Sequence, residues 1–181
     1  NVTLSAAHER DKIRKISNAM RAMNEEAMKL ENSTDSTGVF QMYEVGRSQN
    51  ALMVVRSMGI DPATGNEIYI KRDGSLTFEY DPNDKVEVGN PTPKLQGYIN
   101  SNLNWKGFNL YFSFNYELGA KTWNSTLASK VEGASPYYNA DKRVLYDRWQ
   151  QPGDIAMFRR IDDYESPVYQ SDRLVQKNNF L

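Results

Sequence analysis

The sequence contains no cysteine, and this absence excludes disulfide frameworks, thiolate metal sites and cysteine nucleophiles together. It also has no apolar run of about 18 residues, so neither a transmembrane helix nor a secretory signal is expected. The formal net charge is −1 over 181 residues, which gives no excess of positive charge for a nucleic-acid partner. A β-barrel membrane protein is compatible with this composition, because half of each strand and all of its loops are polar.

Motifs that carry chemistry are also scarce. There is no phosphate loop, dinucleotide fingerprint or nucleophile elbow, and the single histidine, His8, lacks the second histidine of a zinc-protease motif. Asp81 and Asp84 could approach a calcium ion, but they lack the spaced ligand set of a calcium loop, which favours a solvated turn. We therefore expect no enzymatic activity, no cofactor and no catalytic or metal site.

What the sequence does contain is a long alternation of apolar and polar residues on either side of a short turn. The apolar positions are odd-numbered up to Trp105 and even-numbered from Phe108 onward. If the two residues between them form a tight turn, Trp105 and Phe108 are direct neighbours and both apolar sets lie on one face. The predicted pairing then runs from Trp105 opposite Phe108 to Leu95 opposite Leu118.

The two faces of this predicted hairpin differ in polarity. The apolar face holds Ile99, Leu103, Leu110, Phe112 and Phe114. The opposite face holds Asn100, Asn102, Asn104, Asn109, Tyr111 and Ser113. Each arm has about 11 residues, the length that a tilted strand needs to cross the hydrocarbon core of a bilayer. The pattern is typical of a transmembrane β-barrel, in which the apolar set faces lipid and the polar set faces the lumen. A long hairpin in a soluble sandwich is the alternative.

Two further elements are predicted before this hairpin. Ser17 can cap a helix whose apolar residues fall on one stripe, which we expect to be its buried side. That stripe consists of Met20, Met23, Ala27 and Leu30. A second, smaller hairpin is expected with Ile68 and Ile70 on one strand, Leu76, Phe78 and Tyr80 on the other, and a turn at Asp73 and Gly74.

The region after the long hairpin is rich in aromatic residues and has the length of a functional loop. Residues 139–150 have the capping and spacing of a helix, with Leu145 and Trp149 stacked four positions apart. Tyr137, Tyr146 and Trp149 are the candidate contacts of this region for a partner or cargo.

Several short motifs, each of which occurs once, follow one another in a characteristic order along the chain. They are VTLSA at residues 2–6, KIRKISN at 12–18, GIDPATG at 59–65, KRDG at 71–74, WKGF at 105–108, RWQQPGD at 148–154 and SDRLV at 171–175. Their order and spread resemble the SusC/RagA-like TonB-dependent transporters of the Bacteroidetes outer membrane. The resemblance implies an all-β chain that is a segment of a large antiparallel transmembrane β-barrel of about 22 strands. Its long extracellular loops would contain short helices and a small hairpin.

This resemblance also implies a division of the chain. Residues 1–16 would be a barrel strand, residues 94–119 a barrel hairpin and residues 172–181 the start of the next strand. Because barrel neighbours are antiparallel and the tight turn marks the periplasmic end, residues 17–93 and 120–171 would both be extracellular loop regions. A segment with so few strands requires the remainder of the barrel, either in the same protein or in an assembly.

The function implied by the resemblance is import of oligosaccharides or peptides across the bacterial outer membrane. The implied partners are a SusD-like surface lipoprotein, the cargo, and TonB, which would act through parts of the protein outside this chain. Two other functions are compatible with the residues alone. One is a soluble β-rich carbohydrate-binding module that stacks loop aromatics on sugars, and the other is a structural porin or adhesin wall.

Overall fold

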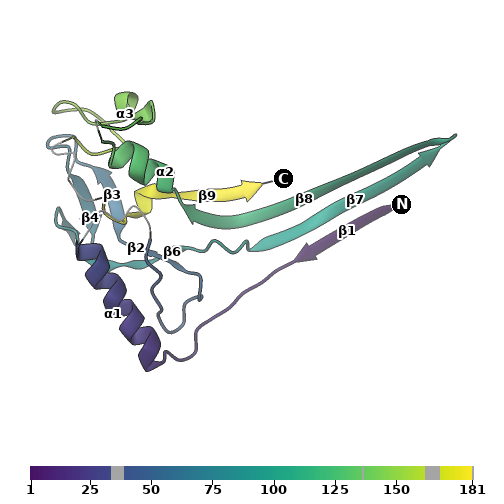
Figure 1. Ribbon diagram of the computed structural model, residues 1–181, viewed down its shortest axis with the longest axis horizontal. Helices are drawn as coiled ribbons and strands as arrows, with labels where there is room; N and C mark the ends of the chain where they lie inside the picture. The colour runs from purple at the N-terminus through teal and green to yellow at the C-terminus, as the bar shows by residue number, and fades with distance from the viewer. Residues whose placement is uncertain (34–38, 136, 162–167, 181) are drawn as a thin grey trace.

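The computed structural model describes residues 1–33, 39–135, 137–161 and 168–180, which form a mostly β chain with a few short helices (Figure 1). The strands are β1 (Val2–Ala7), β2 (Leu52–Val54), β3 (Arg56–Ile60), β4 (Glu67–Ile70), β5 (Leu76–Thr77), β6 (Val86–Gly89), β7 (Leu95–Trp105), β8 (Phe108–Trp123) and β9 (Val175–Phe180). The helices are α1 (Asn18–Ser33), η1 (Pro82–Asp84), α2 (Ser125–Leu127), η2 (Ala128–Glu132), α3 (Arg143–Tyr146) and η3 (Asp172–Leu174). Within the described ranges, no helix combines the length and the apolar character needed to cross a membrane.

The register predicted for the long hairpin is confirmed at every pair. β7 and β8 are antiparallel, and their partners run from Trp105 with Phe108 to Leu95 with Leu118. Between the strands, Lys106 and Gly107 both have positive φ, at 45° and 90°. This is the backbone of the two-residue turn whose twist matches that of the flanking strands. β8 is longer than expected and continues to Trp123.

Two shorter strands flank this hairpin in one antiparallel sheet of order β1-β7-β8-β9. The strand expected over residues 1–16 is shorter than predicted and ends at Ala7. Its partner strand explains the early end, since Ala7 pairs with Gln96 and β7 begins only one residue before that position. On the other side, residues 172–174 form η3 before β9 begins, so only part of the predicted final strand is strand.

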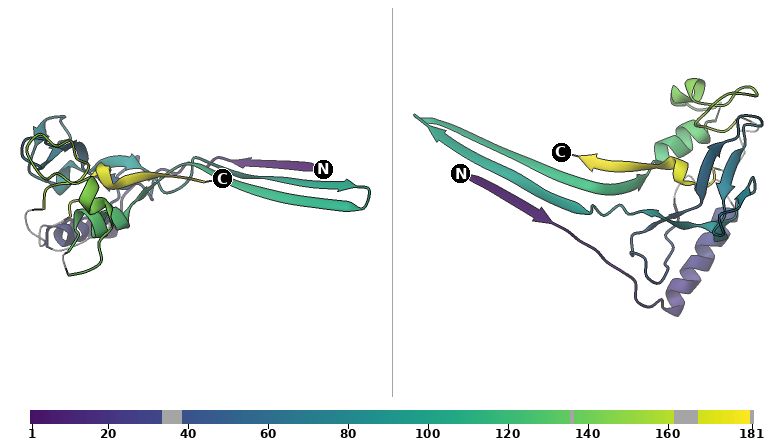
Figure 2. Two further views of the ribbon diagram at one scale, coloured as in Figure 1. Left: turned by 90° about the horizontal axis from the view of Figure 1, so that it is seen from above. Right: turned by 180° about the vertical axis from the view of Figure 1, so that it is seen from behind.

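The long hairpin projects from the rest of the molecule as an arm. Figures 1 and 2 show β7 and β8 extending away from a body formed by β2–β6 and the helices, and no described element covers either face of the outer half of the arm. β1 and β9 lie along the two sides of the arm. The apolar residues near its tip are therefore exposed, including Leu103, Trp105, Phe108 and Leu110.

The body contains two small sheets, one of order β3-β4-β5 and one of β2 with β6. The predicted small hairpin is present, because Ile70 pairs with Leu76 across a turn in which Gly74 has a φ of 89°. Its second strand is shorter than expected and ends at Thr77, so Phe78 and Tyr80 are outside it. Tyr80 instead stacks on Tyr169, with 4.6 Å between ring centroids.

The main apolar core of the body is formed between the end of β8 and the start of β9. It consists of Leu127, Ala128, Val131, Phe158, Val168 and Leu174, with Trp123 and Val144 packed against it. A second cluster, Met42, Ala51 and Met53, receives Met28 from α1. Burial of these side chains stabilises the body by the hydrophobic effect.

Helix α1 begins as predicted, since the Ser17 hydroxyl accepts a hydrogen bond from the Met20 amide at 3.2 Å. The predicted buried stripe is wrong at Met23, which is 52% exposed, and at Leu30, which is 47% exposed, whereas Ala27 is buried as predicted. The side of the helix that contacts the body carries Asn24, Ala27, Met28 and Glu31. Two of these four are polar, so a search for apolar periodicity selects the neighbouring stripe.

Candidate functional site

The apolar face of the four-stranded sheet is continuous across its strands. The register places Leu4 of β1, Ile99 of β7 and Phe114 of β8 in one row. Leu103 pairs with Leu110, and Phe112 lies beside Phe114 with 5.6 Å between ring centroids. The structure thus brings the five residues expected to face lipid onto one surface.

The opposite face of the hairpin is a surface of amides and hydroxyls. Asn100 pairs with Ser113, whose hydroxyl donates to the Asn100 side-chain oxygen at 2.6 Å. The next pairs on this face are Asn102 with Tyr111 and Asn104 with Asn109. Amide and hydroxyl groups both donate and accept hydrogen bonds, so this face can bind water, peptide groups or sugar hydroxyls.

A tyrosine joins three strands at the base of the arm. Tyr116 of β8 lies over Gly97 of β7, where an added Cβ would be only 2.6 Å from the Tyr116 hydroxyl oxygen. The same hydroxyl donates to the Ser5 carbonyl of β1 at 2.8 Å. An aromatic ring over a strand glycine is a known device of curved sheets, and here it also ties β1 to the hairpin.

The three aromatic residues expected at a partner or cargo contact have different surroundings. Tyr137 is 75% exposed and Tyr146 is 77% exposed. Trp149 is half-buried, and its indole nitrogen donates to the Pro62 carbonyl at 2.9 Å. Its ring packs on Gly65, where an added Cβ would be 2.6 Å from it. Trp149 therefore braces the turn before β4.

The predicted helix over residues 139–150 is wrong, because only one turn forms, at α3. Asp141 accepts from the Arg143 guanidinium at 2.8 Å and from the Arg143 amide at 2.9 Å, at the start of this single turn. Leu145 is exposed, and the Trp149 ring is held at the Pro62 turn.

A buried charge network in the body was not predicted from the sequence. Arg173 of η3 binds Glu67 of β4 at 2.8 Å and Glu132 of η2 at 3.0 Å. Arg159 also binds Glu132, at 2.7 Å. Side chains of Arg173, Glu67 and Glu132 are all less than a tenth exposed. The network joins both long segments that flank the hairpin.

Two titratable groups of the body show the effect of this burial. Burial alone would raise the pKa of the Glu67 carboxyl, but the Arg173 charge and its hydrogen bonds outweigh burial and hold that pKa below its usual value. Burial lowers the pKa of the fully buried Lys85, against the opposing effect of Glu31, which binds its ammonium group. Lys85 also donates to the Gln170 side chain at 2.7 Å.

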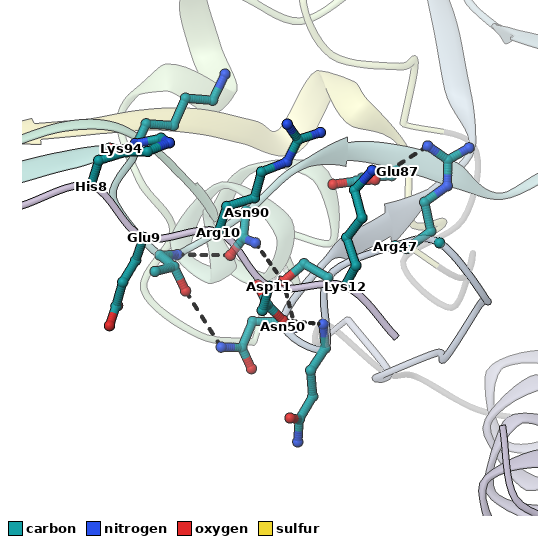
Figure 3. A pocket seen from close by; sticks show the side chains of 14 residues that line it. His8, Glu9, Arg10, Asp11, Lys12, Arg47, Asn50, Glu87, Asn90 and Lys94 are labelled. Atoms are coloured by element: carbon teal, nitrogen blue, oxygen red, sulfur yellow. Dashed lines mark hydrogen bonds and ion pairs between the residues drawn. The ribbon is translucent and has the colours of Figure 1, made fainter. Parts of the chain in front are cut away.

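An open polar pocket of about 840 Å³ lies where the chain leaves β1 and where it enters β7 (Figure 3). Its walls come from residues 8–12, 46–50 and 87–94. Neutral groups form a hydrogen-bonded floor, in which the Asn90 amide donates to the Ser48 hydroxyl at 2.7 Å and the Asn50 amide to Thr92 at 3.4 Å. Sequence reasoning missed this site, because its walls meet only in the fold.

The described part of the chain contains no group of three or more histidine, aspartate or glutamate side chains placed to hold a metal ion. Asp81 accepts from the Asn83 amide at 2.8 Å and so stabilises its own turn, whereas Asp84 accepts from the Arg72 amide at 3.0 Å and joins this turn to the one after β4.

No family model matches the sequence, and no curated protein matches it as a relative. Solved structures that share its fold include the following three. A chain of the RagAB peptide transporter has a TM-score of 0.54 and 22% identity, over 76% of this chain and 16% of that chain. A chain of the RagAB peptide importer in the open-open state has a TM-score of 0.61 and 21% identity, over 76% of this chain and 15% of that chain. A chain of the same importer in the closed-closed state has a TM-score of 0.55 and 19% identity, over 76% of this chain and 16% of that chain. The protein therefore has the fold of a β-rich segment that is about one sixth of a transporter chain.

Proposed function

We propose that this chain forms part of the wall and the outer loops of an outer-membrane TonB-dependent transporter. The intact protein would import peptides or oligosaccharides together with a SusD-like lipoprotein. The observation that carries the proposal is the exposed arm, whose one face is apolar and whose other face is lined by amides and hydroxyls. The fold shared with the RagAB structures supports it.

In this proposal Ile99, Leu103, Leu110, Phe112 and Phe114 face lipid, and Asn100, Asn102, Asn104, Asn109, Tyr111 and Ser113 face the lumen. An apolar face of this size is covered either by lipid or by a second sheet. No element within the described residues covers the arm, which favours lipid over the sandwich of a carbohydrate-binding module. The unpaired edges of β1 and β9 would be joined by the remainder of the barrel.

The experiment measures where the intact protein partitions and what drives its uptake. We expect it to remain with outer membranes until detergent is added, and uptake of labelled peptides or oligosaccharides to stop when TonB is deleted. A porin wall would pass the same cargo without TonB. An intact protein that stays in the aqueous phase, or uptake that is unaffected by TonB deletion, would overturn the proposal.

The two exposed tyrosines are the proposed contacts with the lipoprotein or cargo, whereas Trp149 braces the turn at Pro62 and Gly65. Replacing both Tyr137 and Tyr146 by alanine should weaken capture of the lipoprotein about fivefold or more, the loss typical of an aromatic interface anchor. Met58→Ala removes an apolar side chain of β3 that is 66% exposed and serves as the control. If all variants capture the lipoprotein equally well, the tyrosines are not part of the interface.

A further inference from the structure

Alternate residues at the start of the chain change from apolar to basic. The even-numbered positions are Val2, Leu4, Ala6, His8, Arg10, Lys12 and Arg14. Within β1 these positions share a face with Ile99 of β7, because Leu4 pairs with Ile99. Successive side chains of an extended chain point to opposite sides, so a basic row continues the apolar face beyond Ala7.

The contacts of residues 9–13 fix which side of this segment faces the body. Asp11 accepts hydrogen bonds from the Ser48 hydroxyl at 2.6 Å and from the Gln49 amide at 2.8 Å. Ile13 exchanges two backbone hydrogen bonds with residues 46 and 47, each of 2.8 Å. The odd-numbered side therefore faces the body. Figure 3 shows Arg10 and Lys12 pointing to the side opposite Glu9.

The positive charges of this row are available to a ligand. Arg10 and Lys12 are exposed and form no ion pair with any described residue. Three carboxylates line the same pocket. Asp11 is held by Ser48 and Gln49, Glu87 is paired with Arg47 at 3.3 Å, and Glu9 points to the opposite side. Lys94 adds a third exposed cation from the chain that enters β7. The free charge on this side is positive and suits an anion such as phosphate.

The position of the row selects the source of that anion. An extended chain rises about 3.3 Å per residue, so Arg10 lies only about 13 Å beyond Ala6, the last apolar residue of the row. Lipid headgroups occupy the layer directly outside the hydrocarbon core, where arginine and lysine side chains are favoured. A phosphate free in solution would give no reason for the basic row to continue the apolar face.

From this placement we propose that Arg10, Lys12 and Lys94 bind the phosphate group of a membrane lipid at the outer edge of the barrel wall. The inference rests on the proposed function, because it places the apolar face of β1 in the bilayer. The site would hold lipid beside the pocket that lies where the chain leaves β1 and enters β7 (Figure 3).

The test uses the intact protein purified in detergent, and only its folded fraction. The probes are a labelled phosphatidic acid and the diacylglycerol that lacks its phosphate. Arg10→Gln combined with Lys12→Gln should weaken binding of phosphatidic acid about fivefold for each cation removed, and should leave diacylglycerol binding unchanged. The matched control is Lys130→Gln with Lys142→Gln, which removes two exposed cations from the body and should change neither affinity.

The outcomes distinguish failure of the lipid site from failure of the proposed function. An equal loss of phosphatidic acid binding in both double variants, or no loss in either, would overturn the site. The proposed function would stand if the protein still partitions with membranes. Inorganic phosphate that competes as strongly as phosphatidic acid would show a soluble-anion site and overturn the lipid source. A protein that needs no detergent would overturn the proposed function and the site together. Glu9→Gln, which removes the remaining unpaired carboxylate of the pocket lining, should strengthen binding.

Discussion

At Gly97 the sheet has no room for a side chain. An added Cβ would be 2.0 Å from the Ser5 carbonyl oxygen and 2.8 Å from the Tyr116 ring. Gly97→Ala must therefore push β1 away from β7 or move the tyrosine ring. We expect a loss of about 1–3 kcal/mol, as for overpacking of a close-packed site, measured as a lower fraction of folded intact protein in membranes.

A matched variant at the same place separates the packing effect from the hydrogen bond. Tyr116→Phe keeps the ring over Gly97 and removes only the hydroxyl that donates to Ser5. It should cost about 0.5–1.5 kcal/mol. A Gly97→Ala protein that folds as well as the unchanged protein would show that the contact between β1 and β7 differs from the one described.

The ion pair of Glu67 with Arg173 predicts a dependence of stability on acid. Because the folded protein holds the pKa of Glu67 below its ordinary value of 4.5, the unfolded chain takes up a proton at higher pH than the folded protein. The pair therefore stabilises the fold above about pH 4.5, and this contribution is lost as pH falls through the lower, folded pKa.

This dependence can be measured as the unfolding midpoint of the intact protein between roughly pH 7 and pH 3. Glu67→Gln should be less stable at neutral pH, because it removes the charge that faces Arg173, and its midpoint should fall less steeply with acid. Glu79→Gln, at an exposed position, is the control and should keep the original slope. Identical slopes for all three proteins would contradict a role for this pair.

At the scale of elements, the hairpin could be predicted from the sequence because its information is local. The alternation of apolar residues and the two residues between Trp105 and Phe108 determine the register without any distant contact. The same reasoning placed the small hairpin, since Asp73 and Gly74 form its turn. It failed where that strand ends, because Tyr80 leaves the sheet to stack on Tyr169.

Elements whose partners are polar or distant could not be predicted in this way. The body-facing side of α1 includes Asn24 and Glu31, which bind Tyr43 and Lys85, so apolar spacing pointed to the wrong stripe. Arg173 and Glu67 are separated by 106 positions, and neither lies in a pattern that marks it as buried. The polar pocket has the same origin, since its three walls are close only after folding.

Substitution by arginine is expected to have different effects on the two faces of the hairpin. If Phe112 faces lipid near mid-membrane, Phe112→Arg should cost roughly 2–4 kcal/mol, because the charge loses its hydration in hydrocarbon. Asn102→Arg points into a wet lumen and should leave assembly nearly unchanged, with any effect on passage of cargo. The measurements are folded barrel in outer membranes and uptake per folded barrel. If Asn102→Arg blocks assembly of the barrel and Phe112→Arg is tolerated, the two faces are reversed.

At the scale of the molecule, the two long segments that flank the hairpin fold as one body. The core combines Leu127 and Val131 with Phe158 and Leu174, and the Arg173 network adds Glu67 from the earlier segment. Both segments leave the four-stranded sheet at the same end, opposite the tip of the arm. The body therefore has its own packed interior, whereas the arm has none.

This contrast predicts how the 181-residue chain behaves when it is produced alone. The body should hold its core in buffer, but the arm exposes an apolar face that includes Leu103, Leu110 and Phe114, and β1 and β9 leave unpaired edges. Exposed apolar strands with open edges associate with one another. We expect aggregates in buffer and a dispersed folded species in detergent, measured by size-exclusion chromatography with light scattering.

The cause can be separated by changing only the apolar face. Replacing Leu103, Leu110 and Phe112 by threonine keeps strand propensity and removes most of the apolar area. This variant should need less detergent, and any association that persists comes from the open edges of β1 and β9. A monodisperse monomer of the unchanged chain in buffer, with one sharp cooperative melt, would mean that the arm is covered in water by the protein itself. In that case the apolar face is a core surface, and the membrane assignment of the hairpin fails.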